Sequence, residues 1–499
     1  MILLALFLIS GLGLGYLLSL RIKFIESVFE RLAFSIILGF AFSTLTCFAF
    51  SMWFGALSPF SIGLSILLNI ALCLILIRIG KPVKQLFEIN IKIGKTGPAE
   101  IALFALFVIM LYFNSLSLYE DEEGNIRGIA NTWADYALHA GIINSFALRD
   151  NFPPIYPNLA DAPMRYPFLV DFLSAIFVKE GIALIPSITF TNLLLIFTLL
   201  TLTFAFLKRF LGNRQIAALA MILFFLNGNL GFQYFFDDFN AAPDKAEFLS
   251  KLPRAYSSYP EKNLQFMNLI FSVFIPQRAA LMGFPLVMLL FIFLWRIYKK
   301  EAERLEFLLA GFCLSLLPLI HASSFGVALG MSASIFAFRT LKDRIISPNW
   351  AIFLLPVLLI ALPLLMFINE QQRSDNFFGW QPGWMSKANS LPGEGNLFIK
   401  FWLDNAGFTL ILGVIGLFFL KREQLFFSLP LLMLFVLANL IRFQPWEWDN
   451  TKVLMYWYFA LAAIAAIALQ KVYLPVAKKN KAASLGVISI IILICIFSG

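Results

Sequence analysis

The chain has 499 residues, of which 60% are hydrophobic and only 13% are charged. Apolar blocks of about twenty residues recur along it, matching the ~30 Å hydrocarbon core of a bilayer, which excludes a soluble globular protein. The net charge of +9 does not indicate nucleic-acid binding, because the basic residues stand in short clusters between apolar blocks, where the positive-inside rule accounts for them.

Blocks of this length without alternating polarity are typical of membrane helices rather than of barrel strands, so the sequence predicts an all-α, polytopic membrane protein. In chain order they predict about fourteen spans with the N-terminus outside. Three spans in 1–100 precede a core in 101–471, and a cytoplasmic loop and a short last span occupy 472–499. The first block carries no basic leader and is predicted to be a retained span. Leu305 to Phe338 is predicted to be two spans, broken near Pro318 and His321.

Lysine and arginine assign the loops to sides. About 24 of these bases, but only about 9 acids, fall in the loops predicted to be cytoplasmic, whereas the opposite side holds about 14 bases and about 20 acids. Three outer loops are long, and their aromatic residues and prolines favour ordered, functional segments: 119–185, 235–278 and 369–405. The loops predicted to be cytoplasmic are Arg21 to Arg31, Arg78 to Lys95, Lys208 to Arg214, Arg296 to Arg304, Arg339 to Arg344, Lys421 to Arg422 and Lys471 to Lys481.

The first long outer loop contains the phrase N-T-W-A-D-Y-A-L-H, in which Asp135 and His139 stand four residues apart. A helix predicted from about Thr132 to Leu148 places this carboxylate and imidazole on one face. Asp135 is therefore a candidate general base, and His139 a group that orients it or binds a phosphate oxygen. A structural alternative is open, because Thr132 and Asp135 also fit a helix-start pattern in which Asp135 caps the helix.

An acidic run, Glu120 to Glu123, opens the same loop. Such runs are commonly solvated turns, but their hard oxygen atoms also suit magnesium or manganese. Asp121 and Glu122 are therefore candidate ligands of a divalent metal ion.

A proline-rich stretch then enforces an extended path before a helix resumes near Tyr166. Asp171 lies in an apolar phrase close to a membrane boundary, where an ionisable side chain is either functional or paired. Arg165 is the expected structural partner if Asp171 is paired. If Asp171 belongs to a site, then Arg165, Tyr166 and Asp171 are candidate substrate-binding residues.

Four further candidates lie at the outer ends of later spans. Arg278 has no acid nearby in the sequence, so it either snorkels to the lipid headgroups or binds a phosphate. His321 either binds an anion or caps a helix end. Lys452, close to Asp449, lies where positive charge is disfavoured, so it suits a phosphate at headgroup depth. The tryptophans and tyrosines around it are typical of an aromatic belt.

Together these phrases resemble the GT-C glycosyltransferases, multi-span enzymes that use polyprenyl-phosphate sugars and include protein O-mannosyltransferases and the aminoarabinose transferases of lipid A. The resemblance covers the layout from Leu103 to Lys471. It implies that Asp135 is the essential acid of the outer loop and that Trp448 to Lys452 forms the donor-phosphate end of the site. The chain departs from the class in its additional N-terminal spans and in lacking an acid adjacent to Asp135, so the resemblance does not imply a metal.

The resulting hypothesis is an inverting glycosyl transfer at the outer face of the cell membrane, from a polyprenyl-phosphate sugar to an acceptor hydroxyl. Asp135 takes the hydroxyl proton, and Arg278, His321 and Lys452 stabilise the leaving phosphate. Membrane lipids and the lipid-linked donor are the expected partners. The main alternative is a multi-span transporter or lipid flippase, which would place ionisable residues within the membrane and often shows inverted repeats. A non-catalytic scaffold that binds a partner through its outer loops is the third.

Overall fold

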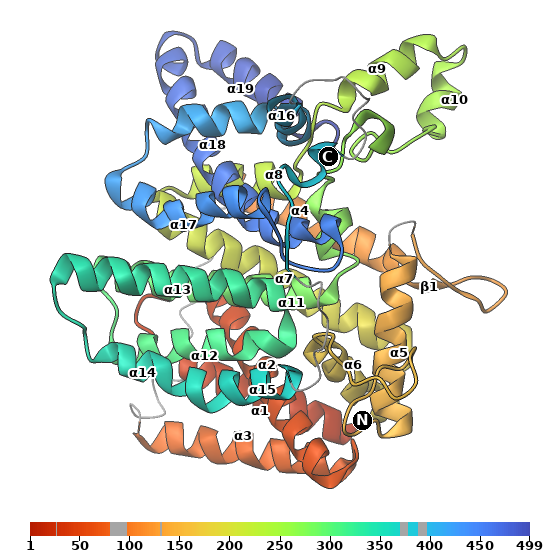
Figure 1. Ribbon diagram of the computed structural model, residues 1–499, viewed down its shortest axis with the longest axis vertical. Coiled ribbons are helices and arrows are strands. Elements are labelled where there is room, and N and C mark those ends of the chain that lie inside the picture. The colour runs from red at the N-terminus through yellow and green to blue at the C-terminus, as the bar shows by residue number, and fades with distance from the viewer. Residues whose placement is uncertain (26, 80–96, 130–131, 370–377, 388–396) are drawn as a thin grey trace. The chain divides into compact units, whose positions relative to one another are not determined.

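Helices make up most of the computed structural model, which describes residues 1–25, 27–79, 97–129, 132–369, 378–387 and 397–499 (Figure 1). The strands in these ranges are two-residue ladders, β1 with β2 and β3 with β4. The all-α prediction is therefore confirmed. The chain divides into two compact units, one made of 1–97, 104–206 and 274–373, the other of 98–103, 207–273 and 374–499.

Ten helices within the described ranges are long and apolar enough to cross a bilayer. This supports a multi-pass membrane protein but does not confirm the predicted count of about fourteen. The other segments predicted to span are shorter helices of 12, 17, 17 and 16 residues: α8 (Arg214–Phe225), α12 (Arg304–Ile320), α17 (Arg422–Ala438) and α19 (Lys481–Ile496). At 1.5 Å per residue, each is shorter than the ~30 Å apolar core.

The first unit contains the N-terminal helices, the first outer loop and the helices that follow Arg278. Its elements are α1 (Ile2–Ser19), α2 (Val28–Phe54), α3 (Pro59–Ile79), most of α4 (Pro98–Ser117), β1 (Tyr119–Glu120), β2 (Ile126–Arg127), α5 (Trp133–Arg149), α6 (Leu169–Lys179), most of α7 (Leu184–Leu211), α11 (Arg278–Lys299), α12 (Arg304–Ile320), α13 (Ala322–Asp343), α14 (Asn349–Pro356), the π-turn η4 (Val357–Ala361) and α15 (Leu362–Asn369).

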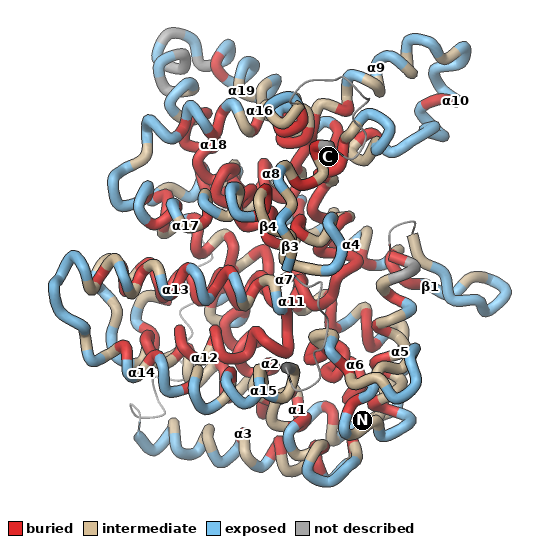
Figure 2. The backbone as a smooth tube through the Cα atoms, viewed as in Figure 1, coloured by how far each residue is buried: buried red, intermediate tan, exposed pale blue. Residues whose placement is uncertain are grey.

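Helix α11 lies at the centre of this unit and is buried along nearly its whole length (Figure 2). A helix that is hydrophobic on every side is stable only when other helices surround it. In contrast, α3 keeps much of its apolar surface exposed, as suits a helix that faces lipid. The predicted break between two spans is confirmed, because α12 ends at Ile320 and the extended backbone of His321, with φ −161°, separates it from α13.

The second unit contains the other two long outer loops and the C-terminal helices. Its core helix is α18, which is buried over most of its length. The elements are α8 (Arg214–Phe225), α9 (Phe232–Ala241), α10 (Lys245–Ser250), η2 (Pro260–Lys262), η3 (Ile270–Phe274), β3 (Gly379–Trp380), η5 (Trp384–Lys387), α16 (Phe398–Leu417), α17 (Arg422–Ala438), β4 (Ile441–Arg442), η6 (Glu447–Asn450), α18 (Thr451–Lys479) and α19 (Lys481–Ile496).

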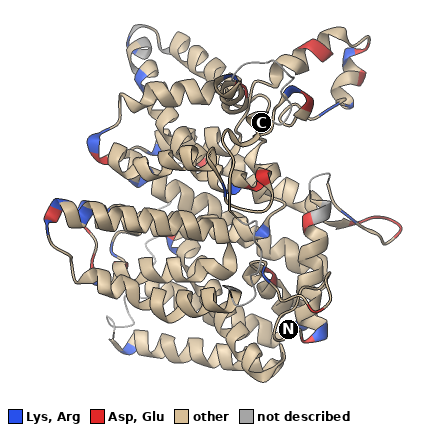
Figure 3. Cartoon of the chain, viewed as in Figure 1, with Lys and Arg blue, Asp and Glu red and all other residues tan. Residues whose placement is uncertain are grey.

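Loops that are predicted to share a side contact one another in the first unit. Lys23 pairs with Glu303 at 2.5 Å, and Lys300 with Asp343 at 2.8 Å, so three predicted cytoplasmic loops meet. The amino terminus instead pairs with Glu180 of the first outer loop at 3.1 Å. Charged side chains accordingly gather in loops and at helix ends (Figure 3).

The second unit follows the same rule. On one side, Gln424 Nε2 donates to the Phe210 carbonyl at 2.8 Å, which joins the predicted cytoplasmic loop Lys208 to Arg214 to the helix turn that follows the predicted loop Lys421 to Arg422. On the other, Asn263 donates to the Ser386 carbonyl at 3.0 Å, which joins two predicted outer loops. The contacts in both units agree with the predicted alternation of loops. Which side faces the cytoplasm stays a prediction, and the segments 80–96, 370–377 and 388–396 of the predicted loops lie outside the described residues.

Candidate functional site

Helix α5 carries both residues of the predicted catalytic pair. It runs from Trp133 to Arg149, which agrees with the predicted helix to within one residue at each end. Thr132 is the N-cap residue but makes no side-chain capping bond: its backbone is helical, with ψ −21°, rather than extended, and its hydroxyl lies 3.0 and 2.7 Å from the carbonyl oxygens of Ser117 and Ile129. Asp135 lies in the first turn and is half-buried, where a carboxylate also interacts favourably with the helix dipole.

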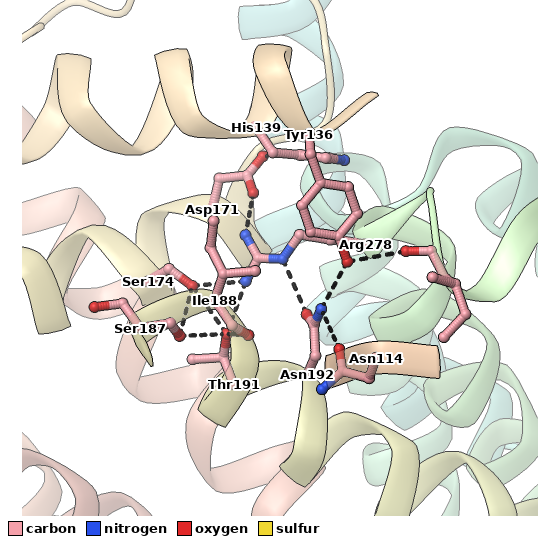
Figure 4. A network of polar contacts seen from close by, with 11 residues as sticks. Asn114, Tyr136, His139, Asp171, Ser174, Ser187, Ile188, Thr191, Asn192 and Arg278 are labelled. Carbon is pink, nitrogen blue, oxygen red and sulfur yellow. Dashed lines mark hydrogen bonds and ion pairs between the residues drawn. The ribbon is translucent and has the colours of Figure 1, made fainter. Parts of the chain in front are cut away.

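His139, one turn further along α5, has no exposed surface. Its Nδ1 lies 2.8 Å from Oδ2 of Asp171 on α6, and the other carboxylate oxygen of Asp171 accepts a hydrogen bond from Arg278 Nη1 at 2.5 Å (Figure 4). Asp171 and Arg278 are equally inaccessible to solvent. Packing of α6 against both α5 and α11 brings the three side chains together.

The Arg278 guanidinium has further partners, all from helices of the first unit. Its Nη2 donates to the hydroxyls of Ser174 and Thr191 at 2.6 and 2.7 Å. Its Nε donates to Oδ1 of Asn192 at 3.0 Å. A buried cation is tolerated only when it is paired and hydrogen-bonded, and both conditions are met here.

The network continues from Asn192 back to α5. Asn192 Nδ2 donates to the Tyr136 hydroxyl at 2.9 Å and to Asn114 Oδ1 at 3.0 Å, and the Tyr136 hydroxyl donates to the Ile275 carbonyl at 3.0 Å. Side chains from α4, α5, α6, α7 and α11 are thus joined in one continuous set of hydrogen bonds (Figure 4). We call this set the buried network; its side chains are Asn114, Tyr136, His139, Asp171, Ser174, Thr191, Asn192 and Arg278.

The partner expected for Asp171 was wrong. Arg165 is exposed, and Asp171 pairs instead with Arg278, 107 residues away in sequence. The alternative in which Arg278 snorkels to the lipid headgroups is also wrong, because its side chain is fully buried and pairs with Asp171. Sequence reasoning missed Asn114, Tyr136, Ser174, Thr191 and Asn192; the available signal was polar side chains within apolar blocks.

The imidazole of His139 is fixed from the sides as well. The rings of Tyr136 and Tyr166 meet it edge-on, with centroid distances of 6.0 and 5.8 Å. Its Nε2 atom is buried and has no hydrogen-bond partner among the described residues. The structure therefore holds this ring in one orientation, with one ring nitrogen that no described side chain satisfies.

His321 and Lys452 also lie in defined surroundings. His321 is buried, its Nδ1 is 2.6 Å from the Ser324 hydroxyl, and its Cβ lies against Gly283 of α11. Lys452, in the second unit, pairs with Asp449 at 3.0 Å, so part of its charge is already balanced.

The acidic run near the start of the loop forms a hairpin turn between β1 and β2. Asp121 accepts hydrogen bonds from Arg127 Nε at 2.7 Å and from the Asn125 amide at 2.7 Å. The Arg127 guanidinium, with the Asn125 amide, lowers the pKa of Asp121 to about 2. Within the ranges that the structure covers, no three histidine, cysteine or acidic side chains are placed to hold a metal ion.

No protein-family model and no curated protein matches the chain.

Proposed function

We propose that this protein is a membrane glycosyltransferase that moves a sugar from a polyprenyl-phosphate donor to an acceptor hydroxyl at the extracytoplasmic face. The observation that carries the proposal is the placement on α5 of a half-buried Asp135 four residues before His139, whose ring Asp171 and Arg278 hold in place. Catalytic groups need such support, because small errors in their placement cost much of the rate.

Asp135 is proposed as the general base. Of Asp135 and His139, Asp135 is the one that keeps access to solvent, since His139 is fully buried. An acceptor hydroxyl arriving from the aqueous side can therefore reach this carboxylate. Proton transfer to a positioned base contributes typically about 100- to 10,000-fold to a rate.

Arg278 takes a different part from the one the sequence suggested. Its guanidinium is directed at four side chains of the buried network, so we propose that it holds Asp171 in place rather than binding the leaving phosphate. His321 and Lys452 keep the proposed phosphate-binding role. Lys452→Ala should then weaken binding of polyprenyl phosphate to the purified protein, and unchanged binding would remove Lys452 from this role.

The test of the base is Asp135→Asn, assayed for sugar transfer with a panel of polyprenyl-phosphate sugars. We expect a loss of about 100- to 10,000-fold in kcat. Asp161→Asn is the matched control, because Asp161 is exposed in the same loop and its positive φ of 57° suits asparagine. Full activity in Asp135→Asn would refute the proposed base.

One observation favours a transporter as the second candidate. An acid, a histidine and an arginine buried together among helices are also typical of proton-coupled carriers. An assay in proteoliposomes separates the two functions. A carrier moves its substrate across the membrane chemically unchanged, whereas a transferase releases polyprenyl phosphate.

A further inference from the structure

The hydrogen bonds of Asp171 determine which nitrogen of His139 carries a proton. An ionised carboxylate accepts hydrogen bonds and donates none. Arg278 occupies Oδ1 of Asp171, and His139 Nδ1 is the group at Oδ2. Nδ1 must therefore be the donor, so it carries a hydrogen.

The charge balance decides the state of the other ring nitrogen. Arg278 and Asp171 form a neutral pair with no exposed surface. Among the described residues, the phenols of Tyr136 and Tyr166 pack against His139 and are neutral near pH 7, while Asp135, one turn earlier on α5, is half-buried and screened by solvent. A second proton on His139 would leave one uncompensated positive charge in a desolvated site, which is costly. Nε2 is therefore an unprotonated acceptor.

We infer that Nε2 of His139 accepts a hydrogen bond from a hydroxyl of the substrate, and that Asp171 and Arg278 are positioning residues that hold it for this purpose. The atom has no exposed surface and lacks a protein partner among the described residues, so a donor that enters as neighbouring side chains move on substrate binding is what completes it. A phosphodiester offers only acceptor oxygens, which excludes it as the ligand of Nε2. This hydroxyl is not the acceptor hydroxyl, because the proton of the acceptor hydroxyl is transferred to Asp135 in the proposed reaction.

This inference rests on the proposed function only in taking the hydroxyl to be that of a sugar substrate. The tautomer can be tested without any activity. The chain has two histidines, so the His139 signal in ¹⁵N-histidine NMR of the wild-type protein in nanodiscs is identified as the one that disappears in His139→Asn. We expect the neutral form with hydrogen on Nδ1 at pH 7, and an imidazolium or an Nε2-protonated ring would overturn the inference.

The same sample tests the ligand. The panel of polyprenyl-phosphate sugars is compared with polyprenyl phosphate, which carries no sugar hydroxyl. We expect the Nε2 signal to shift with at least one sugar lipid and to stay unchanged with the phosphate lipid. Equal shifts with both, or no shift with any member of the panel, would overturn the assignment; the latter result would leave water as the partner of Nε2.

Two substitutions separate substrate contact from structure. In His139→Asn, the amide nitrogen can replace Nδ1 and keep the bond to Asp171, but no acceptor remains at the Nε2 position. We expect kcat/KM to fall roughly 10- to 100-fold with an unchanged melting temperature. His139→Gln places an amide oxygen near Nε2 and should recover part of the activity. Full activity in His139→Asn would overturn the inference. So would losses of kcat/KM in the two variants that parallel decreases in their melting temperatures.

If no lipid supports transfer in the wild type, the proposed function fails, whereas the NMR result still decides the tautomer.

Discussion

Asp171 and Arg278 illustrate how two opposite charges can persist without any contact with water. Each carboxylate oxygen of Asp171 has a donor, and the guanidinium is bonded along both of its edges. Removal of one partner leaves the other uncompensated, which is far more costly than replacement of the whole pair by apolar side chains. The pair therefore positions His139 and ties α6 to α11, while its net contribution to stability is small.

Arg278→Met should accordingly destabilise the protein strongly. We expect a loss of about 3–5 kcal/mol in the free energy of unfolding, because Asp171 then stays buried without its cation. The double variant Asp171→Leu, Arg278→Met should recover much of this loss. Unfolding by denaturant in detergent measures both. Additive losses in the double variant would show that the two side chains are not coupled.

The Asp121 carboxylate gives a pH dependence at the hairpin. Its pKa lies at about 2, below the ordinary 3.8, chiefly because of the hydrogen bond from Arg127. Because the pKa is lowered, the ionised carboxylate stabilises the hairpin fully at pH values above the ordinary pKa of 3.8. This contribution is lost as the pH falls through about 2.

Arg127→Gln should therefore raise the pKa of Asp121 towards 3.8. Selective ¹³C labelling of aspartate allows an NMR titration of this carboxyl group. Arg165→Gln changes an exposed arginine elsewhere in the loop and should leave the pKa of Asp121 unchanged. An equal titration in the wild type and Arg127→Gln would contradict the assigned cause.

Helices α1 and α2 approach closely because glycines line their contact. A Cβ atom on Gly15 would lie 2.3 Å from the Ser35 carbonyl oxygen, and one on Gly39 would lie 2.1 Å from that of Gly11. Small residues allow such close contact between membrane helices, whose association depends on packing more than on exclusion of water.

Gly15→Ala should push α1 away from α2 and destabilise the protein by about 1–3 kcal/mol. Gly13→Ala is the matched control on the same helix, since nothing lies within 4 Å of its added methyl group. We expect the control to be neutral or to gain up to about 1 kcal/mol from helix propensity. Thermal unfolding in detergent measures the difference, and equal effects would contradict the close packing of α1 and α2.

For the chain as a whole, the predicted alternation of loops implies that the β1–β2 hairpin and the connection after α13 face opposite sides of the membrane. Cys47, Cys313 and Cys495 are buried, and Cys73 lies in α3, so the native thiols give a low labelling background. Glu122 and Ile346 are both exposed and are suitable positions for new thiols.

In a Cys73→Ser background, Glu122→Cys should react with a membrane-impermeant maleimide in intact cells. Ile346→Cys should react only after the membrane has been permeabilised, because Ile346 lies just after the predicted cytoplasmic loop Arg339 to Arg344 and precedes α14. The reverse pattern would place Asp135 on the cytoplasmic side and refute an extracytoplasmic active site.

The order of residues was sufficient to predict the helical membrane fold, the position of α5 and the break at His321. Apolar length, proline and loop charge are local properties, and the bilayer converts them directly into spans and turns. Four-residue spacing likewise placed Asp135 and His139 on one face of α5, since a helix repeats every 3.6 residues.

The pairing of Asp171 was decided by tertiary packing. Arg165 is six residues away and Arg278 is 107, and separation along the chain says nothing about which cation will share a buried space. Only the packing of α6 against α5 and α11 brings His139, Asp171 and Arg278 together. A charge removed from water must be matched within a few ångströms, and that distance is set by how helices pack rather than by where residues stand in the sequence.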